Sequence, residues 1–403
     1  MKTDSYETIV IGGGQAGLSV GYHLAKRNLR FVILDENERV GDAWRKRWDS
    51  LRLFTPACLN GLPGMPFDAP KWSFPTKDEM GEYLEAYAER FSLPVRTGVR
   101  VEGVTQDEGR FVVSLGDERL EARNVVVATG ALRVPKLPPF AAELDPRIVQ
   151  LHSADYRNPS QLLDGDVLVV GVGNSGAEIA YELAETRRCL LAGASKGEIP
   201  APHGSRRFRV MFRAIRFFGH RVLRTDTRIG RKVGPKVAAK GPPLIRRKGA
   251  DFAEVGIERI ARVSGVQDGL PLLEDRRALD VRNVVWCTGF RTDFSWIDLP
   301  AFDQEGRPLH ERGVVESVRG LYFAGLIFQY SLTSDVLPNG GRDAEYVARH
   351  IATRQAKEPS AMPRRPAQAG TSAARPAMET QAGLSRRGSR RRPPNKTRAP
   401  LRR

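Results

Sequence analysis

The chain has 403 residues, which is enough for two domains with a sizeable apolar core. Its 3 cysteines, Cys58, Cys189 and Cys287, form no C-x-x-C pair, which disfavours a disulfide scaffold, a redox-active dithiol and a zinc site, and we expect no metal. We expect no signal peptide, and no run of about 20 apolar residues predicts a membrane span, so a reducing cytoplasm is the expected location.

The net charge of +17 is distributed unevenly along the chain. Residues 204–248 carry 15 Lys and Arg against one acidic residue, and residues 354–403 carry 14 against two. The rest of the chain therefore has a net charge of −9. Composition thus predicts an acidic main body with two basic segments, not a protein that is basic throughout.

A glycine fingerprint follows the first predicted strand. Residues 8–11 are typical of a buried parallel strand, and GGGQAG at residues 12–17 leads directly into a helix predicted over residues 16–27. Such a strand–turn–helix unit holds the pyrophosphate of a dinucleotide at the helix N-terminus. The next strand, residues 31–34, ends in an acid that suits the hydroxyls of a ribose. The predicted ligands are Gly12, Gly14, Gln15, Ala16, Gly17 and Asp35, with Glu36 as the nearby alternative acid.

The same fingerprint returns as GVGNSG at residues 171–176, between a strand at 166–170 and a helix at 177–185. The following strand, residues 189–192, ends without an acid. Because a carboxylate there would repel a 2′-phosphate, its absence favours NADPH, with NADH as the alternative. Arg187 and Arg188 are further candidate cations for that phosphate. The predicted ligands are Gly171, Gly173, Asn174, Ser175, Gly176, Ser195 and Lys196.

Two more buried strands end in small-residue turns, Ala128-Thr129-Gly130 and Thr288-Gly289. In proteins with two dinucleotides, such turns let the backbone pass close to the cofactors. Their spacing around the second fingerprint predicts an α/β fold with two Rossmann-like dinucleotide-binding domains. Residues 1–160 and 276–353 would form a discontinuous FAD domain around an inserted NADPH domain at residues 161–275.

Both basic segments leave alternatives open. Residues 208–218 predict an amphipathic helix that either packs on its own domain or forms a membrane-surface helix or a lid for a lipophilic substrate. Residues 354–403 are rich in Pro and Arg, predict disorder and could contact anionic lipid, whereas nucleic acid is a disfavoured partner. The predicted apolar stripe of the helix contains Phe208, Met211, Phe212, Ile215 and Phe218.

The sequence resembles the class B flavin monooxygenases, which include flavin-containing monooxygenases, plant YUCCA enzymes and bacterial CzcO-like relatives. The resemblance extends over residues 6–351. It is carried by both fingerprints and by VGDAWR (40–45), RWDSLRLFTP (47–56), FPTK (74–77), YLEAYA (83–88), LHSADY (151–156), GLYFAG (320–325) and GGRDA (340–344).

This resemblance implies a reaction. FAD is reduced by NADPH, reacts with O₂ to a C4a-(hydro)peroxyflavin, and transfers one oxygen atom to a small or lipophilic substrate by N- or S-oxygenation or a related step. No side chain is assigned as a catalyst. The resemblance places Gly41, Asp42 and Trp44 near the flavin, with Thr55 and Asn60 as further candidates. Asp343 either caps the last helix, predicted over residues 344–351, or belongs to a helix end that faces the flavin pyrophosphate.

The chain departs from the family pattern at several positions. Pro146 and Ile148 stand where the linker usually begins F-x-G, and His152 is either a linker residue or a functional one. Tyr156 favours the N- or S-oxygenases over the Baeyer–Villiger branch. Pro56 stands where animal-type members have an Asn that supports the flavin hydroperoxide, so uncoupled release of H₂O₂ is an alternative outcome.

Two other functions remain open from sequence. One is an FAD-dependent NAD(P)H reductase or oxidase that inserts no oxygen. The other is a nucleotide-bound interaction protein that acts through its basic tail on nucleic acid or membrane. The sequence does not predict an oligomeric state.

Overall fold

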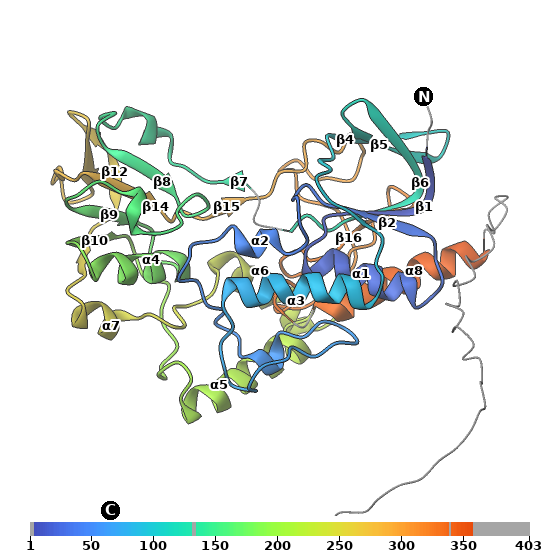
Figure 1. Cartoon of the computed structure of the whole chain (residues 1–403), viewed down its shortest axis with the longest axis horizontal. Helices are drawn as coiled ribbons and strands as arrows, with labels where there is room; N and C mark the ends of the chain where they lie inside the picture. The colour runs from blue at the N-terminus through green and yellow to red at the C-terminus, as the bar shows by residue number, and fades with distance from the viewer. Residues whose placement is uncertain (1–3, 131–133, 338–339, 358–403) are drawn as a thin grey trace, which may run out of the picture. The chain divides into compact units, whose positions relative to one another are not determined.

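The fold is that of a computed structural model, which describes residues 4–130, 134–337 and 340–357 (Figure 1). The described residues all belong to one compact unit. Two sheets, each rich in parallel strands and each bearing one glycine fingerprint, organise this unit. Within the described ranges, no helix has the length and apolar character needed to cross a membrane.

The first sheet is built around β1 (Asp4–Ile11), which lies between β2 (Phe31–Leu34) and β6 (Glu118–Val127) in parallel register. β3 (Val95–Arg96) extends the sheet beyond β2. β5 (Arg110–Leu115) pairs antiparallel with the first half of β6, β4 (Gly103–Asp107) pairs antiparallel with β5, and β16 (Leu321–Phe323) pairs with the last residues of β6. The chain therefore returns to the first sheet after completing the second.

Three helices pack on one face of this sheet. α1 (Gln15–Ala25) packs against α3 (Lys77–Arg90) and α8 (Gly340–Lys357). α3 begins at a capping box in which Thr76 and Glu79 satisfy each other's backbone amides. The buried faces of the three helices share a core with Val10, Ile33 and Val126 of the sheet. This packing fixes the turn between β1 and α1, where the first fingerprint lies.

The second sheet is entirely parallel, in the order β11 (Glu258–Ile260), β10 (Cys189–Ala192), β9 (Val167–Val170), β14 (Asn283–Trp286) and β8 (Val149–His152). Every residue of β10 and β14 is buried, as expected for parallel strands covered on both faces. α4 (Asn174–Ala184) follows β9, and the hairpin of β12 (Val263–Gln267) and β13 (Leu270–Leu273) lies apart from the sheet.

Sheet membership differs from the predicted domain boundaries at two strands. β8 and β14 belong to the second sheet, whereas boundaries at 160 and 276 would assign both to the first domain. The reason is that β14 pairs with β9 and β8 together, a long-range pairing that local patterns do not reveal. The chain passes between the sheets through β7 (Val134–Pro135) and β15 (Phe290–Arg291), which pair with each other. The division into two domains stays a prediction.

The long insert after β10 is helical. It contains α5 (Arg206–Phe217), the π-helical turn η4 (Phe218–Val222), α6 (Arg228–Lys240) and α7 (Gly249–Glu254). The remaining short elements are α2 (Asp42–Arg45) and the 3-10 turns η1 (Ala57–Leu59), η2 (Pro139–Glu143) and η3 (Pro159–Gln161).

The predicted helices occur, with shifted ends. α1 stops at Ala25, before Asn28 takes a φ of +54°. α8 is longer than predicted and includes residues 354–357, which the sequence assigned to the tail. Its charged, helix-favouring residues continue the amphipathic pattern past that boundary. The predicted disorder of residues 358–403 falls outside the described residues.

Candidate functional site

The first fingerprint forms a tight turn in which two glycines are required by the protein itself. Gly12 has a φ of +108°, and a Cβ there would lie 2.5 Å from the carbonyl oxygen of Ala128. A Cβ on Gly17 would lie 1.8 Å from the Gly12 carbonyl oxygen. A Cβ on Gly14, by contrast, would have no atom within 4 Å. Gly14 therefore leaves open space where a ligand can approach the backbone.

The start of α1 suits an anion. Its N-cap residue is Gly14, which offers no side chain to cap the helix amides. The first-turn N–H groups, from Gln15, Ala16 and Gly17, add to the partial positive charge of the helix end. The Gln15 side chain turns away to the Asp335 carbonyl at 3.5 Å. The backbone of this turn, and not its side chains, is thus placed to bind a phosphate.

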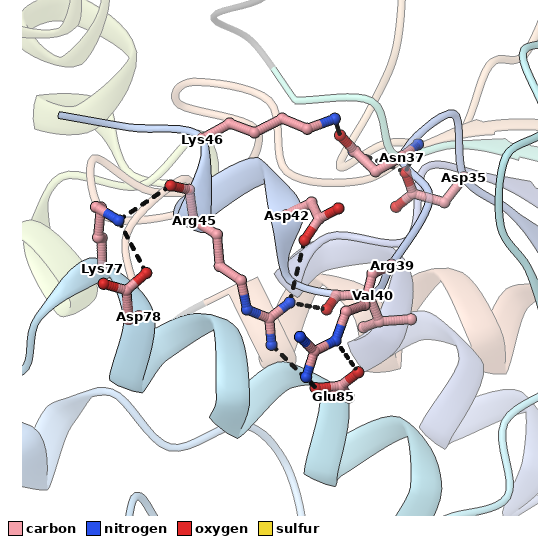
Figure 2. A network of polar contacts seen from close by, with 10 residues as sticks. All are labelled: Asp35, Asn37, Arg39, Val40, Asp42, Arg45, Lys46, Lys77, Asp78 and Glu85. Atoms are coloured by element: carbon pink, nitrogen blue, oxygen red, sulfur yellow. Dashed lines mark hydrogen bonds and ion pairs between the residues drawn. The ribbon is translucent and has the colours of Figure 1, made fainter. Parts of the chain in front are cut away.

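Asp35 lies at the end of β2 and is tied to the same turn. Its carboxylate accepts the Gly13 N–H at 2.8 Å and the Asn37 N–H at 2.8 Å. The Asn37 side-chain amide also donates to it at 2.9 Å, and Lys46 donates to the Asn37 amide oxygen at 3.0 Å (Figure 2). Asp35 is buried, whereas the alternative acid, Glu36, is exposed. The structure therefore makes Asp35 the acid that is fixed in position beside the fingerprint.

The segment with Gly41, Asp42 and Trp44 is rigidly held beside this turn. A Cβ on Gly41 would lie 2.3 Å from the carbonyl oxygen of Gly81 in α3, and its φ is +90°. Arg45 donates to the Val40 carbonyl at 2.7 Å and to the Asp42 carboxylate at 3.2 Å, and Glu85 of α3 accepts from Arg45 at 3.0 Å (Figure 2). Trp44 is half-buried against the apolar core that α1, α3 and α8 share with the first sheet.

The second fingerprint repeats the packing of the first. Gly171 has a φ of +113°, and a Cβ there would lie 2.3 Å from the carbonyl oxygen of Cys287. A Cβ on Gly176 would lie 1.9 Å from the Gly171 carbonyl oxygen, while one on Gly173 would meet nothing within 4 Å. Gly173 is also the N-cap of α4 and supplies no capping side chain. The two fingerprints are therefore equivalent in geometry as well as in sequence.

A basic pocket distinguishes the second site. Lys196, which follows β10, and Lys236 of α6 line one cavity of about 450 Å³ with Val237, Gly241 and Pro243. The Lys196 Nζ lies 3.1 Å from the position of a Cβ on Gly241. No local pattern pointed to Lys236, because only the fold of the insert brings α6 to the end of β10.

Asn174 connects this pocket to the fingerprint. Its amide oxygen accepts the Ile245 N–H at 2.9 Å, and its amide nitrogen donates to the Pro243 carbonyl at 3.0 Å. The Asn174 side chain thus holds the pocket wall against the start of α4. The Ser195 hydroxyl accepts the Gly197 N–H at 3.2 Å and shapes the loop that carries Lys196.

The side chains of the other two candidate cations bind groups outside this pocket. Arg187 donates to the carbonyls of Leu163 and Pro159, and Arg188 pairs with Asp166 and Glu258. Both arginines precede β10, so they lie at the opposite end of the strand from Lys196. They are not phosphate ligands in this arrangement.

The two small-residue turns lie where the chain crosses between the sheets. Ala128 donates its N–H to the Ile11 carbonyl at 2.7 Å, and Gly130 and Gly289 have φ of +80° and +86°. Thr288 donates its hydroxyl to the Lys136 carbonyl, joining the second turn to β7. Thr129 is partly exposed next to Gly130. Each turn thus meets the first glycine of one fingerprint.

His152 is a buried linker residue. Its Nδ1 accepts the Ala154 N–H at 3.1 Å, so Nε2 carries the proton and donates to the Gly289 carbonyl at 3.0 Å. Burial lowers the pKa of His152. Tyr156 is also buried and donates to Glu182 at 2.7 Å, and Trp48 belongs to the same apolar core as Tyr156. These residues serve packing and orientation in the described structure.

Thr55 and Asn60 are bonded to each other. The Thr55 hydroxyl donates to the Asn60 amide oxygen, and the Asn60 amide nitrogen donates to the Thr55 carbonyl at 3.1 Å. Both residues are buried. The sequence gave Asn60 as a candidate near the flavin, which stays a prediction, and the structure shows its side chain bonded to Thr55 in the loop after Phe54.

Asp343 stands out near the start of α8. It is 1% exposed, and neither carboxylate oxygen makes a hydrogen bond of normal geometry among the described residues, although the Ser334 side chain lies close enough to lower its pKa. The Arg342 guanidinium lies 3.9 Å away, and burial raises the pKa of Asp343. A buried acceptor without a donor is costly, so this carboxylate is suited to hydroxyl groups of a ligand.

The comparisons with known proteins agree with this geometry. The pyridine nucleotide-disulphide oxidoreductase family matches residues 9–192, from the first fingerprint to the end of β10. The CzcO-like oxidoreductase of Geobacillus kaustophilus is 38% identical over 347 residues, which are 86% of this chain and 98% of the relative. The indole-3-pyruvate monooxygenase YUCCA1 of Oryza sativa is 35% identical over 179 residues, 43% of this chain and 44% of the relative. A solved flavin-containing monooxygenase of Stenotrophomonas maltophilia is 26% identical with a TM-score of 0.68, and the match covers 87% of this chain and 99% of that one.

The chain belongs to the family of CzcO-like oxidoreductases. It is therefore an oxidoreductase of the flavoprotein class, and the predicted fold of two Rossmann-like units is confirmed. The 3 cysteines of this CzcO-like chain are all free. Burial raises the pKa of Cys189 to about 12 and also raises that of Cys287, which makes both thiols poor nucleophiles.

Proposed function

We propose that the protein is an NADPH-dependent FAD monooxygenase that inserts one oxygen atom into a small or lipophilic substrate. The observation that carries this proposal is the repeated packing of the two fingerprints, each with its central glycine open, in one compact unit. Two equivalent dinucleotide sites suit an enzyme that moves electrons from one dinucleotide to another.

The first fingerprint is the proposed FAD site. Its residues fit the group: Gly14 leaves room for the pyrophosphate, the start of α1 offers backbone amides, and Asp35 lies ready for a ribose. The orphaned carboxylate of Asp343 fits hydroxyls of the ribityl chain. When bound, FAD supplies the electron transfer and the oxygen activation, and the protein supplies orientation.

The second fingerprint is the proposed nicotinamide site, and the pocket beside it supports NADPH over NADH. Lys196 and Lys236 concentrate positive charge at the end of β10, where an NAD-specific site would carry an acid. Two lysines suit a phosphate, which each can bind as a point charge.

In this proposal, the insert helps to exclude water from the region of Thr55 and Asn60. The inner side of α5 packs through Phe208, Met211 and Phe212 against Phe54 and Phe74. His203, at the start of the insert, donates its Nε2 proton to the Phe54 carbonyl at 3.2 Å. This cover lies directly on the loop that carries Thr55, and a dry site limits side reactions of activated oxygen.

Isotope incorporation tests the proposal. The FAD-loaded enzyme is supplied with NADPH, ¹⁸O₂ and one of four probes: indole-3-pyruvate, methyl phenyl sulfide, N,N-dimethylaniline or cyclohexanone. We expect one ¹⁸O atom in the product of at least one probe, with NADPH consumption that rises when that probe is present. Consumption of NADPH with release of H₂O₂ and no labelled product from any probe would contradict oxygen insertion.

A second candidate, an uncoupled NAD(P)H oxidase, is favoured by one observation. Pro56 replaces the family Asn, and the nearby Asn60 amide is already bonded to Thr55. In that case the amount of H₂O₂ released equals the amount of NADPH consumed with every probe.

A chain truncated after Lys357 tests the interaction-protein alternative, since loss of NADPH turnover with the tail would contradict an enzyme whose site lies in residues 1–357. The three free cysteines fit a reducing compartment, and we propose a cytoplasmic location.

A further inference from the structure

The insert exposes apolar side chains to an extent unmatched in the rest of the described chain. Among the described residues, 11 large apolar side chains are exposed, and seven of them lie between residues 210 and 237. Scattered exposed apolar residues need no explanation, but such a concentration marks an interaction surface. The seven are Val210, Ile215, Phe217, Phe218, Ile229, Val233 and Val237.

The elements that carry these exposed side chains already pack against the rest of the protein through other residues. α5 already buries Phe208 in the cluster with Phe54 and Phe74. η4 is seated through Gly219, where a Cβ would lie 2.9 Å from Thr333, and α6 through Gly234, where a Cβ would lie 2.0 Å from the Phe328 ring. The predicted single stripe on α5 is therefore divided: its first residues pack inward, and Ile215 and Phe218 are exposed.

Exposed cations lie among the apolar residues along the same segment of the sequence. Arg206 and Arg207 line a surface hollow of about 500 Å³ with Val210 and Met211, and Arg213 stacks on the Trp72 ring at 5.2 Å. The whole segment, residues 204–248, has 15 Lys and Arg against one acid. We call the seven apolar residues and these cations the basic apolar face. Its cations are Arg206, Arg207, Arg213, Arg221, Arg228, Arg231 and Lys232.

We propose that the basic apolar face binds peripherally to the surface of an anionic phospholipid bilayer. Its arginines and lysines match lipid phosphates, and its Phe, Val and Ile side chains match the boundary between headgroups and acyl chains. A second copy is a poor occupant, because two strongly positive faces would repel each other. The basic tail is repelled for the same reason, and a nucleic acid would leave the aliphatic side chains without a partner.

Vesicle sedimentation with the full-length FAD-loaded enzyme tests this. We expect partition to vesicles of phosphatidylcholine with about 30% phosphatidylglycerol, and at least about tenfold less to phosphatidylcholine alone. The double variant Phe217→Ser/Phe218→Ser keeps every charge, including the tail, and we expect its partition to fall by about tenfold or more. The matched control is Leu137→Ser/Leu309→Ser, which removes two exposed leucines outside the insert and leaves partition unchanged.

Three results would overturn the proposal. Equal partition of the Phe217→Ser/Phe218→Ser variant and the parent would show attraction by charge alone, through the tail or the arginines. If the Leu137→Ser/Leu309→Ser control lost as much partition to vesicles, membrane binding would not be specific to the basic apolar face. A parent that sediments as a dimer and becomes monomeric on the Phe217→Ser/Phe218→Ser change would make a second copy the occupant. NADPH turnover without vesicles checks that each variant is folded.

Discussion

The Asp35 carboxylate accepts the Gly13 backbone N–H at 2.8 Å, which joins the end of β2 to the middle of the first fingerprint. This bond leaves only part of the carboxylate free for a ligand, because Asn37 also donates to it. Asp35 therefore has two roles in the proposed FAD site: it shapes the turn proposed to hold the pyrophosphate, and it offers an acceptor for the ribose. Glu36, the alternative acid, is exposed.

Replacement of Asp35 should therefore release FAD. We expect Asp35→Ala to lower FAD affinity by about tenfold or more, because it removes an acceptor and leaves the Gly13 amide unpaired. The measurement is flavin absorbance per polypeptide after gel filtration at a series of FAD concentrations. Asp107→Ala, at an exposed position in β4, is the control and keeps its flavin. Full flavin content in Asp35→Ala with loss in Glu36→Ala would instead assign the ribose to Glu36.

Gly12 and Gly14 should respond differently to the same added methyl group. Gly12→Ala places a Cβ 2.5 Å from the Ala128 carbonyl oxygen at a φ of +108°, so we expect a protein that is unstable or unfolded. Gly14 has a φ of −77° and open space around it, so Gly14→Ala should melt within a few degrees of the parent. Its FAD affinity should fall about tenfold or more, because the methyl group occupies the space proposed for the pyrophosphate. Thermal melts without added FAD, together with FAD titration, separate the two effects. Unchanged FAD affinity in Gly14→Ala would contradict the assigned site.

Local pattern was enough to predict the units that carry the fingerprints, because strand, turn and helix follow one another directly in the sequence. Features that depend on distant segments were not predicted. β8 and β14 resemble any buried strand, and only the pairing of β14 with both β9 and β8 reveals that they belong to the second sheet. Lys236 comes from a helix that folds back over the end of β10. Arg187 and Arg188 were misjudged because they precede the strand whose far end bears Lys196.

Lys196 and Lys236 should determine the choice between the two nicotinamide dinucleotides. We expect Lys236→Ala to raise the KM for NADPH by about tenfold, because a charge-assisted bond to the 2′-phosphate is lost, and to leave the KM for NADH unchanged. Lys196→Ala should act in the same direction, and the double variant should prefer neither dinucleotide. Lys232→Ala, on the same helix but outside the pocket, is the matched control. A similar rise in KM for both dinucleotides would show that Lys236 supports the fold of the pocket and does not read the phosphate.

The stability of the enzyme should fall in weak acid because its histidines are held neutral. Burial lowers the pKa of His203 from 6.5 to about 4, and the same holds for His23 and His220. The folded-state pKa lies below the unfolded one, so the unfolded chain binds more protons between these values. The free energy of unfolding is therefore highest above pH 6.5 and falls as the pH drops from 6.5 towards 4.

His203→Gln keeps a donor for the Phe54 carbonyl but cannot take up a proton. We expect it to reduce the loss of stability between about pH 7 and pH 5 by about 1 kcal/mol, measured by urea unfolding at both pH values. Lys71→Gln, an exposed change that removes no group titrating in this range, should leave the loss unchanged. If His203→Gln and the parent lose stability equally, His203 is not held neutral by the fold.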